Sequence, residues 1–199
     1  AVSEDEGETW GPLEQAGDWG GIVVMGCDFA VRGKPGHYIC MFHDDGRFIR
    51  EGSKQEKPVV FTLYQTRSTD GGLTWGEPET IFARSDVHLC EPGIVRSPDG
   101  GTLAALMREN SRRRNSYVIF SKDEGTTWSD PREVPAALTG DRHTAVYAPD
   151  GRLFIALENQ EPKQVSLEIS LSELEGGKVN LNIPVGGINL SYQSVSIQE

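Results

Sequence analysis

The sequence predicts an all-β protein built from hairpin units that follow one another along the chain. Three observations support this fold class: an eight-residue pattern that occurs three times, Asp-Gly pairs beside short apolar runs, and no convincing amphipathic helical pattern of ten or more residues. The copies of the pattern start at residues 3, 68 and 121. Such spacings are in the range of repeated β units.

The repeated pattern is S-x-D-x-G-x-T-W, called the box below. It reads SEDEGETW at 3–10, STDGGLTW at 68–75 and SKDEGTTW at 121–128. An Asp side chain can accept bonds from nearby backbone N–H groups and close a turn, Gly takes an unusual φ, and Trp packs under the next strand. We therefore expect a structural role for the box residues Asp5, Trp10, Asp70, Trp75, Asp123 and Trp128.

Asp-Gly pairs predict tight turns between the strands, because glycine tolerates the positive φ that such turns require. The pairs stand at 45–46, 99–100 and 150–151. Predicted strands cover 37–42, 93–97, 103–107, 117–121, 144–148 and 153–157. Counting one hairpin and one box as a unit divides the chain into units at about 11–75, 76–128 and 129–199.

The last part of the chain, 165–199, has a different composition. Apolar residues alternate there with polar ones between two Gly-Gly pairs, which predicts a strand meander, and the segment holds no Trp, Phe or Arg. We therefore expect the repeated units to cover 1–164. The meander at 165–199 is either the last unit with a decayed box or a separate module.

Composition excludes several classes of function. The chain has 199 residues and a formal net charge of −11, which disfavours nucleic acid and anionic membranes as partners. No apolar run approaches the ~18 residues of a membrane span. Cys27, Cys40 and Cys90 show no C-x-x-C spacing, so neither a disulfide framework nor a zinc site is predicted. We expect no cofactor or metal, and His43-Asp44-Asp45 is interpreted as a turn.

The box resembles the Asp box, or BNR repeat, of the sialidase superfamily, over residues 1 to about 160. This resemblance implies a β-propeller of four-stranded blades, six in sialidases, with the boxes away from the active site. Propellers with this repeat also occur in sortilin-like receptors and photosystem assembly factors. The resemblance therefore implies the fold more specifically than it implies an activity.

A second resemblance lies between the second and third boxes. The stretch CEPGIVRSPDGGTLAALMREN resembles the sialidase strand–turn–strand unit. Glu91 and Arg108 stand at the positions of the functional glutamate and arginine of that unit. The resemblance implies that Glu91 activates a tyrosine nucleophile and that Arg108 is one of three arginines binding the sialic acid carboxylate. A guanidinium suits a planar carboxylate. The arginines at 112–114 are either part of this basic cluster or a solvated loop.

Three further residues are site candidates by position. Arg142 and His143 directly precede a predicted strand, as Glu91 does in its own unit, and we expect them to bind substrate. Asp28 stands before the first hairpin and is the candidate for a second catalytic carboxylate.

The chain also departs from the sialidase pattern. It is shorter than a six-bladed propeller requires, no arginine follows Arg152, and only Tyr192 loosely resembles the nucleophilic tyrosine. We expect a piece of a longer protein, two copies closing one ring as a homo-oligomer, or an open stack of sheets.

Two functions from different classes follow. The first is a sialidase-like glycoside hydrolase domain or fragment, acting on terminal sialic acid or a related acidic sugar. The alternative is a non-catalytic propeller module that binds carbohydrate or protein. The family resemblance favours an extracellular or periplasmic location.

Overall fold

The described part of the chain forms three antiparallel sheets. The computed structural model describes residues 1–17, 24–45, 58–158 and 165–169. In the described residues the single helical turn is a 3₁₀ helix, η1, at Ala136–Leu138. The all-β fold class is confirmed, and none of the described helices is long and apolar enough to span a membrane.

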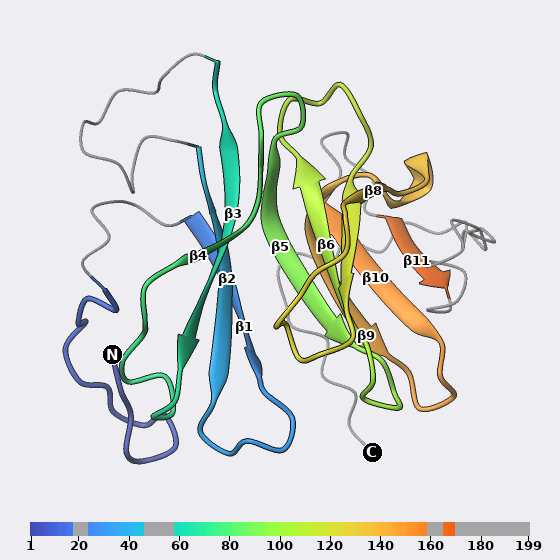
Figure 1. Ribbon diagram of the computed structural model, residues 1–199. Helices are drawn as coiled ribbons and strands as arrows, with labels where there is room; N and C mark the ends of the chain where they lie inside the picture. Colours follow the sequence, from blue (N-terminus) through green and yellow to red (C-terminus); the bar gives the residue numbers. More distant parts are fainter. Residues whose placement is uncertain (18–23, 46–57, 159–164, 170–199) are drawn as a thin grey trace.

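The first two sheets each contain four strands in chain order. The first is formed by β1 (Val24–Ala30), β2 (Tyr38–Asp44), β3 (Phe61–Ser68) and β4 (Glu79–Arg84). The second is formed by β5 (Leu89–Arg96), β6 (Leu103–Glu109), β7 (Tyr117–Ser121) and β8 (Arg132–Glu133). Figure 1 shows the sheets side by side, with the first on the left and the second in the middle.

The third sheet has the order β11-β10-β9. Its strands are β9 (Asp141–Tyr147), β10 (Leu153–Glu158) and β11 (Val165–Ile169). Because β11 pairs antiparallel with β10, the first residues of the sequence-defined tail add a strand to this sheet. The decayed box and Tyr192 lie outside the described residues.

Asp-Gly turns connect the first two strands, in chain order, of the second and third sheets. Gly100 has a φ of 75° between β5 and β6, and Gly151 has a φ of 86° between β9 and β10. The first sheet differs, because its β1–β2 hairpin turns at 31–37, where the Val31 N–H donates to the His37 carbonyl at 3.0 Å. Asp45 instead follows the other end of β2, and Gly46 lies outside the described residues.

The boxes form nearly identical turns. In the second box the Thr74 N–H donates to Asp70 Oδ1 at 2.9 Å, the Thr74 hydroxyl donates to Asp70 Oδ2 at 2.5 Å, and the Gly72 N–H donates to Ser68 Oγ at 2.9 Å. The bonds from Thr74 lower the pKa of Asp70 to about 2. The same pattern of bonds closes the turns around Asp5 and Asp123.

The position of the boxes corrects the unit boundaries expected from the sequence. The second box connects β3 to β4 and the third connects β7 to β8, so each sheet continues past its box. The tryptophans also differ from one another. The indole N–H of Trp75 donates to Gly72 in its own box, whereas that of Trp128 donates to Gln65 of the first sheet.

Two apolar layers hold the three sheets together. Between the first and second sheets lie Met41, Leu63, Leu89, Ala105, Met107 and Ile119. Between the second and third lie Leu106, Val118, Leu138, Leu153 and Ile155. Successive residues of β6, such as Ala105 and Leu106, therefore face different neighbouring sheets, as the period of two in a strand requires.

Candidate functional site

Glu91 and Arg108 lie at the end of the second sheet opposite its box. Cys90 pairs with Arg108 at one end of the sheet, whereas the box begins at Ser121, which pairs with Leu103 at the other end. In Figure 1 the start of β5 is at the top. The box and the Glu91–Arg108 pair therefore lie at opposite ends of the sheet.

A β-bulge directs Glu91 out of the regular strand pattern. Cys90 pairs with Arg108 and Gly93 pairs with Leu106, so two residues of β5 oppose one residue of β6. Glu91 has a φ of 51°, in the left-handed region that residues other than glycine rarely adopt. Bulges and strained backbone are concentrated at functional sites.

The first strands of the other sheets carry the same irregularity. In the third sheet Asp141 pairs with Glu158 and Thr144 with Ala156, and Arg142 has a φ of 48°. In the first sheet the register shifts between Val24 and Cys27. Arg142 therefore occupies the place in β9 that Glu91 occupies in β5.

Glu91 and Arg108 form a largely buried ion pair. Arg108 Nη1 donates to Glu91 Oε1 at 2.9 Å, and the two side chains are 21% and 10% exposed respectively. Arg108 Nη2 donates to Asn110 Oδ1 at 2.7 Å. The other oxygen of Glu91, Oε2, is buried and has no hydrogen-bond partner among the described residues.

The donors of Arg108 are only partly used. Each terminal nitrogen of a guanidinium carries two N–H groups. One donor of Nη1 is used by Glu91 and one of Nη2 by Asn110. Among the described residues, the remaining donor on each terminal nitrogen is available to a planar anion. The pair thus offers two donors and one buried acceptor.

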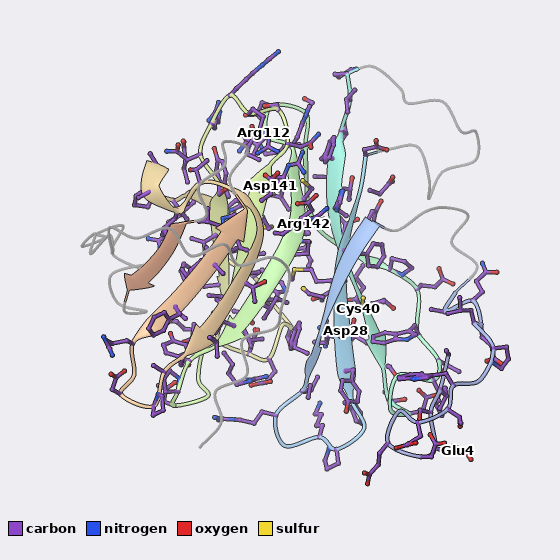
Figure 2. All side chains as sticks on the ribbon, turned by 180° about the vertical axis from the view of Figure 1, so that it is seen from behind. Glu4, Asp28, Cys40, Arg112, Asp141 and Arg142 are labelled. Atoms are coloured by element: carbon purple, nitrogen blue, oxygen red, sulfur yellow. The ribbon has the colours of Figure 1, made fainter. Side chains whose placement is uncertain are left out.

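Asp141 connects this pair to a second arginine. Its Oδ1 lies 3.4 Å from Arg108 Nε, within ion-pair range but without hydrogen-bond geometry. Arg112 donates to both oxygens of Asp141, at 2.5 and 2.7 Å. These bonds raise the pKa of Arg112. Figure 2 shows Arg112, Asp141 and Arg142 at the same end of the molecule.

A buried carboxylate, Glu109, organises the loop that carries Arg112. Glu109 is 3% exposed. It accepts bonds from the N–H groups of His88, Ser111 and Arg113 and from the Ser111 hydroxyl, at 2.7–3.2 Å. Burial raises the pKa of Glu109, but these bonds together outweigh burial and lower it. The hydrogen bonds to Glu109 therefore fix the path of the loop backbone.

The first sheet contributes His43 to the site. The Glu91 N–H donates to His43 Nδ1 at 3.4 Å, a long hydrogen bond. The His43 ring stacks on Phe61 with centroids 5.9 Å apart, and Phe61 stacks on His88 at 4.7 Å. Burial is the main cause that lowers the pKa of His43, so the neutral acceptor form is favoured at neutral pH.

Asp28 lies away from these residues, whereas His143 lies beside Asp141 and Glu91 but is buried. Asp28 is exposed on β1 opposite Cys40, and Figure 2 shows this pair away from Arg112, Asp141 and Arg142. Burial, and then the hydrogen bond with Asp28, raise the pKa of Cys40. His143 is 3% exposed, and its Nε2 lies 2.9 Å from the Leu138 carbonyl oxygen. The structure thus places Asp28 outside the cluster and gives His143 a buried packing position.

Sequence reasoning missed Asp141, Asn110 and His43 as members of the cluster and left Arg112 undecided. Asp141 directly precedes Arg142, and allowing for a bulge at the start of the strand could have identified it. His43 could have been found because it occupies the place in β2 that Arg108 occupies in β6. In the part of the chain that the structure describes, no group of three or more His, Cys, Asp or Glu residues could hold a metal ion.

Solved structures share this fold at low sequence identity. A protein of unknown function from Dyadobacter fermentans matches 89% of this chain with a TM-score of 0.67 and 18% identity. The Hadza microbial sialidase Hz136 matches 83% of it with a TM-score of 0.61 and 21% identity. The matches cover 49% and 36% of those two chains, so this chain spans at most about half of them.

Among curated proteins, the chain is 26% identical over 116 residues to vacuolar protein sorting/targeting protein 10 of Debaryomyces hansenii. This match covers 58% of the chain and 7% of that much longer relative. The family is shown by a match over most of the chain. With residues 1–181 matching its model, and with its sheets arranged as β-propeller blades, the protein belongs to the BNR repeat-like domain family.

Proposed function

We propose that this chain contributes the Glu91–Arg108 part of a sialidase-type site, which binds a terminal acidic sugar such as sialic acid and hydrolyses its glycosidic bond. One observation carries the proposal: the buried pair leaves one N–H on each terminal nitrogen of Arg108, and one oxygen of Glu91, without hydrogen-bond partners among the described residues. A planar carboxylate fits the donors, and a hydroxyl group fits the acceptor.

In this function Arg108 binds the carboxylate of the sugar, and Glu91 acts on the nucleophile. The resemblance implies a tyrosine nucleophile: its phenol oxygen bonds to the anomeric carbon, the glycosidic C–O bond breaks, the phenol proton passes to Glu91, and the released aglycone oxygen takes a proton from water. A second water then hydrolyses the sugar–tyrosine bond. A neutral phenol avoids repulsion with an anionic substrate. The bulge geometry of β9 supports Arg142 as a further cation of the site, since it occupies the place equivalent to Glu91.

Two observations favour the second candidate, a binding module without catalysis. Asp28 lies outside the cluster, which leaves no second catalytic carboxylate assigned. The curated relative is named as a vacuolar protein sorting/targeting protein rather than as a hydrolase. In this alternative the same donors and acceptor bind an acidic sugar or a carboxylate on a protein without turnover.

Hydrolysis of a fluorogenic sialoside, together with titration of N-acetylneuraminic acid, tests the proposal. Wild type should bind the acid, and in an assembly that completes the propeller it should also turn over the sialoside; Glu91→Gln should remove this turnover. Glu77→Gln is the matched control, because Glu77 also precedes a proline but is exposed. Binding without turnover would leave the binding module, whereas no binding by folded wild type would contradict both candidates for this sugar.

A further inference from the structure

We propose that Asp141 is a positioning residue of this site: it holds Arg112 beside Arg108 across the boundary between the second and third sheets, so that a ligand carboxylate meets two guanidinium groups. This inference rests on the proposed function and identifies Arg112 as an additional cation of the site. It starts from the single carboxylate oxygen, Asp141 Oδ1, that faces Arg108 Nε at 3.4 Å and Arg112 Nη1 at 2.5 Å.

Asp141 is well placed for this task. It lies at the start of β9, immediately before the strained residue Arg142, and is only 9% exposed. Both of its oxygens accept from Arg112, which fixes the plane of that guanidinium as well as its distance. A bidentate pair at a buried carboxylate is more restrictive than an exposed ion pair.

Arg112 needs such a partner to stay in the site. It lies on the connection between β6 and β7, with a φ of 60° and a side chain that is 33% exposed. Its like charge repels Arg108. The Glu109 bonds fix the loop backbone, but they do not determine where the long Arg112 side chain points. Among the described residues, the Arg112 guanidinium donates its hydrogen bonds to Asp141.

The charges of the four ionised side chains in this arrangement nearly cancel before a ligand binds. Glu91 and Asp141 balance Arg108 and Arg112, so the unliganded cluster carries no large excess of positive charge. A carboxylate therefore binds through correctly oriented N–H groups more than through net charge. This makes the orientation set by Asp141 important for affinity.

Asp141→Asn separates positioning from simple charge, because the two effects have opposite signs. Removing a negative charge near an anion site strengthens anion binding if only charge matters. If Asp141 positions Arg112, calorimetric titration should show N-acetylneuraminic acid binding weakened about tenfold. Asp141→Glu should recover part of the affinity. Tighter or unchanged binding by folded Asp141→Asn would overturn the proposal.

Asp150→Asn is the matched control. Asp150 lies at the opposite end of the same hairpin, is exposed, and accepts from Arg152 at 2.7 Å. Like Asp141→Asn, the Asp150→Asn substitution removes one negative charge from the third sheet. The affinity of Asp150→Asn for N-acetylneuraminic acid should therefore equal that of wild type. If Asp141→Asn fails to fold, Arg112→Gln decides, because it changes an exposed loop position. Arg112→Gln should also bind about tenfold more weakly, and unchanged affinity would overturn the proposal.

The NMR signals of the guanidinium groups distinguish failure of this inference from failure of the proposed function. A guanidinium held by a bidentate carboxylate rotates slowly and gives separate Nη signals. Arg112 should show them in wild type and Asp150→Asn, and lose them in Asp141→Asn. If wild type binds no sialic acid, the proposed function fails, and with it the ligand role of Arg112. The Nη signals of Arg112 then still decide whether Asp141 positions Arg112. Separate Nη signals that persist in Asp141→Asn would refute this positioning role.

Discussion

Glu91 accepts a hydrogen bond from Arg108 through one carboxylate oxygen, at 2.9 Å, while its other oxygen is buried without a hydrogen-bond partner among the described residues. A buried acceptor left in this state costs free energy, of the order of 1–3 kcal/mol. Sites tolerate such a cost when a ligand or a reacting group completes the bond. We therefore expect Oε2 of Glu91 to accept a hydrogen bond from a hydroxyl group of the ligand or of the nucleophile.

Glu91→Gln should separate binding from turnover. The amide cannot take a proton from a nucleophile, so sialoside hydrolysis should be lost. The negative charge that opposes an incoming carboxylate is also removed, so the dissociation constant for N-acetylneuraminic acid should stay the same or fall. Calorimetry and the fluorogenic assay on the same preparation measure both. A large loss of affinity would show that Glu91 acts mainly in holding Arg108.

Arg108→Lys should weaken acid-sugar binding by about tenfold or more, because lysine keeps the charge but lacks the planar pair of donors. Titration with N-acetylneuraminic acid and with neutral N-acetylglucosamine measures the effect and its dependence on the carboxylate. Arg84→Lys is the control, since Arg84 is exposed and bonded to nearby Asp86. Equal affinities for the two variants would exclude Arg108 from the site.

Asp70→Asn should reduce stability in a pH-dependent way. The folded-state pKa of Asp70 is about 2, below its ordinary value of 3.8, chiefly because the Thr74 hydroxyl and N–H donate to the carboxylate. The folded state therefore favours the charged form. The contribution is present in full above the ordinary pKa and is lost as the pH falls from 3.8 towards 2.

Thermal unfolding at pH 6 and at pH 2–3 checks this prediction. The difference in unfolding midpoint between wild type and Asp70→Asn should be largest at pH 6 and should become smaller as the pH falls to 2. A ¹³C titration of the Asp70 carboxyl group provides the independent measurement. A midpoint difference that does not change with pH would mean that the charge of the box aspartate contributes nothing to stability.

Gly93→Ala should destabilise the protein by roughly 1–3 kcal/mol and weaken ligand binding. A Cβ atom at Gly93 would lie 1.8 Å from the carbonyl oxygen of His143, so β5 and β9 would have to separate beside Glu91. Gly76→Ala is the control, because its nearest atom would be 3.6 Å away. Chemical unfolding measures stability, and a Gly93→Ala variant as stable as Gly76→Ala would contradict the tight contact.

Local features could be predicted from the sequence. The boxes and the turns at 99–100 and 150–151 depend on residues a few positions apart, so their chemistry is visible in the sequence. The strand β3 at Phe61–Ser68 was missed because it lacks a continuous apolar run. Its buried polar groups are instead satisfied locally, as where the Thr66 hydroxyl donates to the Gly76 carbonyl at 2.6 Å.

The site was only partly predictable, for a different physical reason. Glu91 and Arg108 pair across one hairpin, and the Asp-Gly turn between them fixes that relationship in the sequence. The bond between Arg112 and Asp141 joins two sheets, and it depends on a bulge that shifts β9 by one residue. No short-range sequence pattern reveals the bulge in β9. The inference from strand position therefore selected Arg142 and His143 rather than Asp141.

The contact between Gly93 and His143 also limits how this fold can change over evolutionary time. The two inner strands meet there with no side chain from β5 between them. Any replacement at this position can only widen the gap, since glycine is already the smallest residue. A closer approach of the second and third sheets at this contact would therefore require a change in the backbone path itself, because no side chain remains there to be shortened.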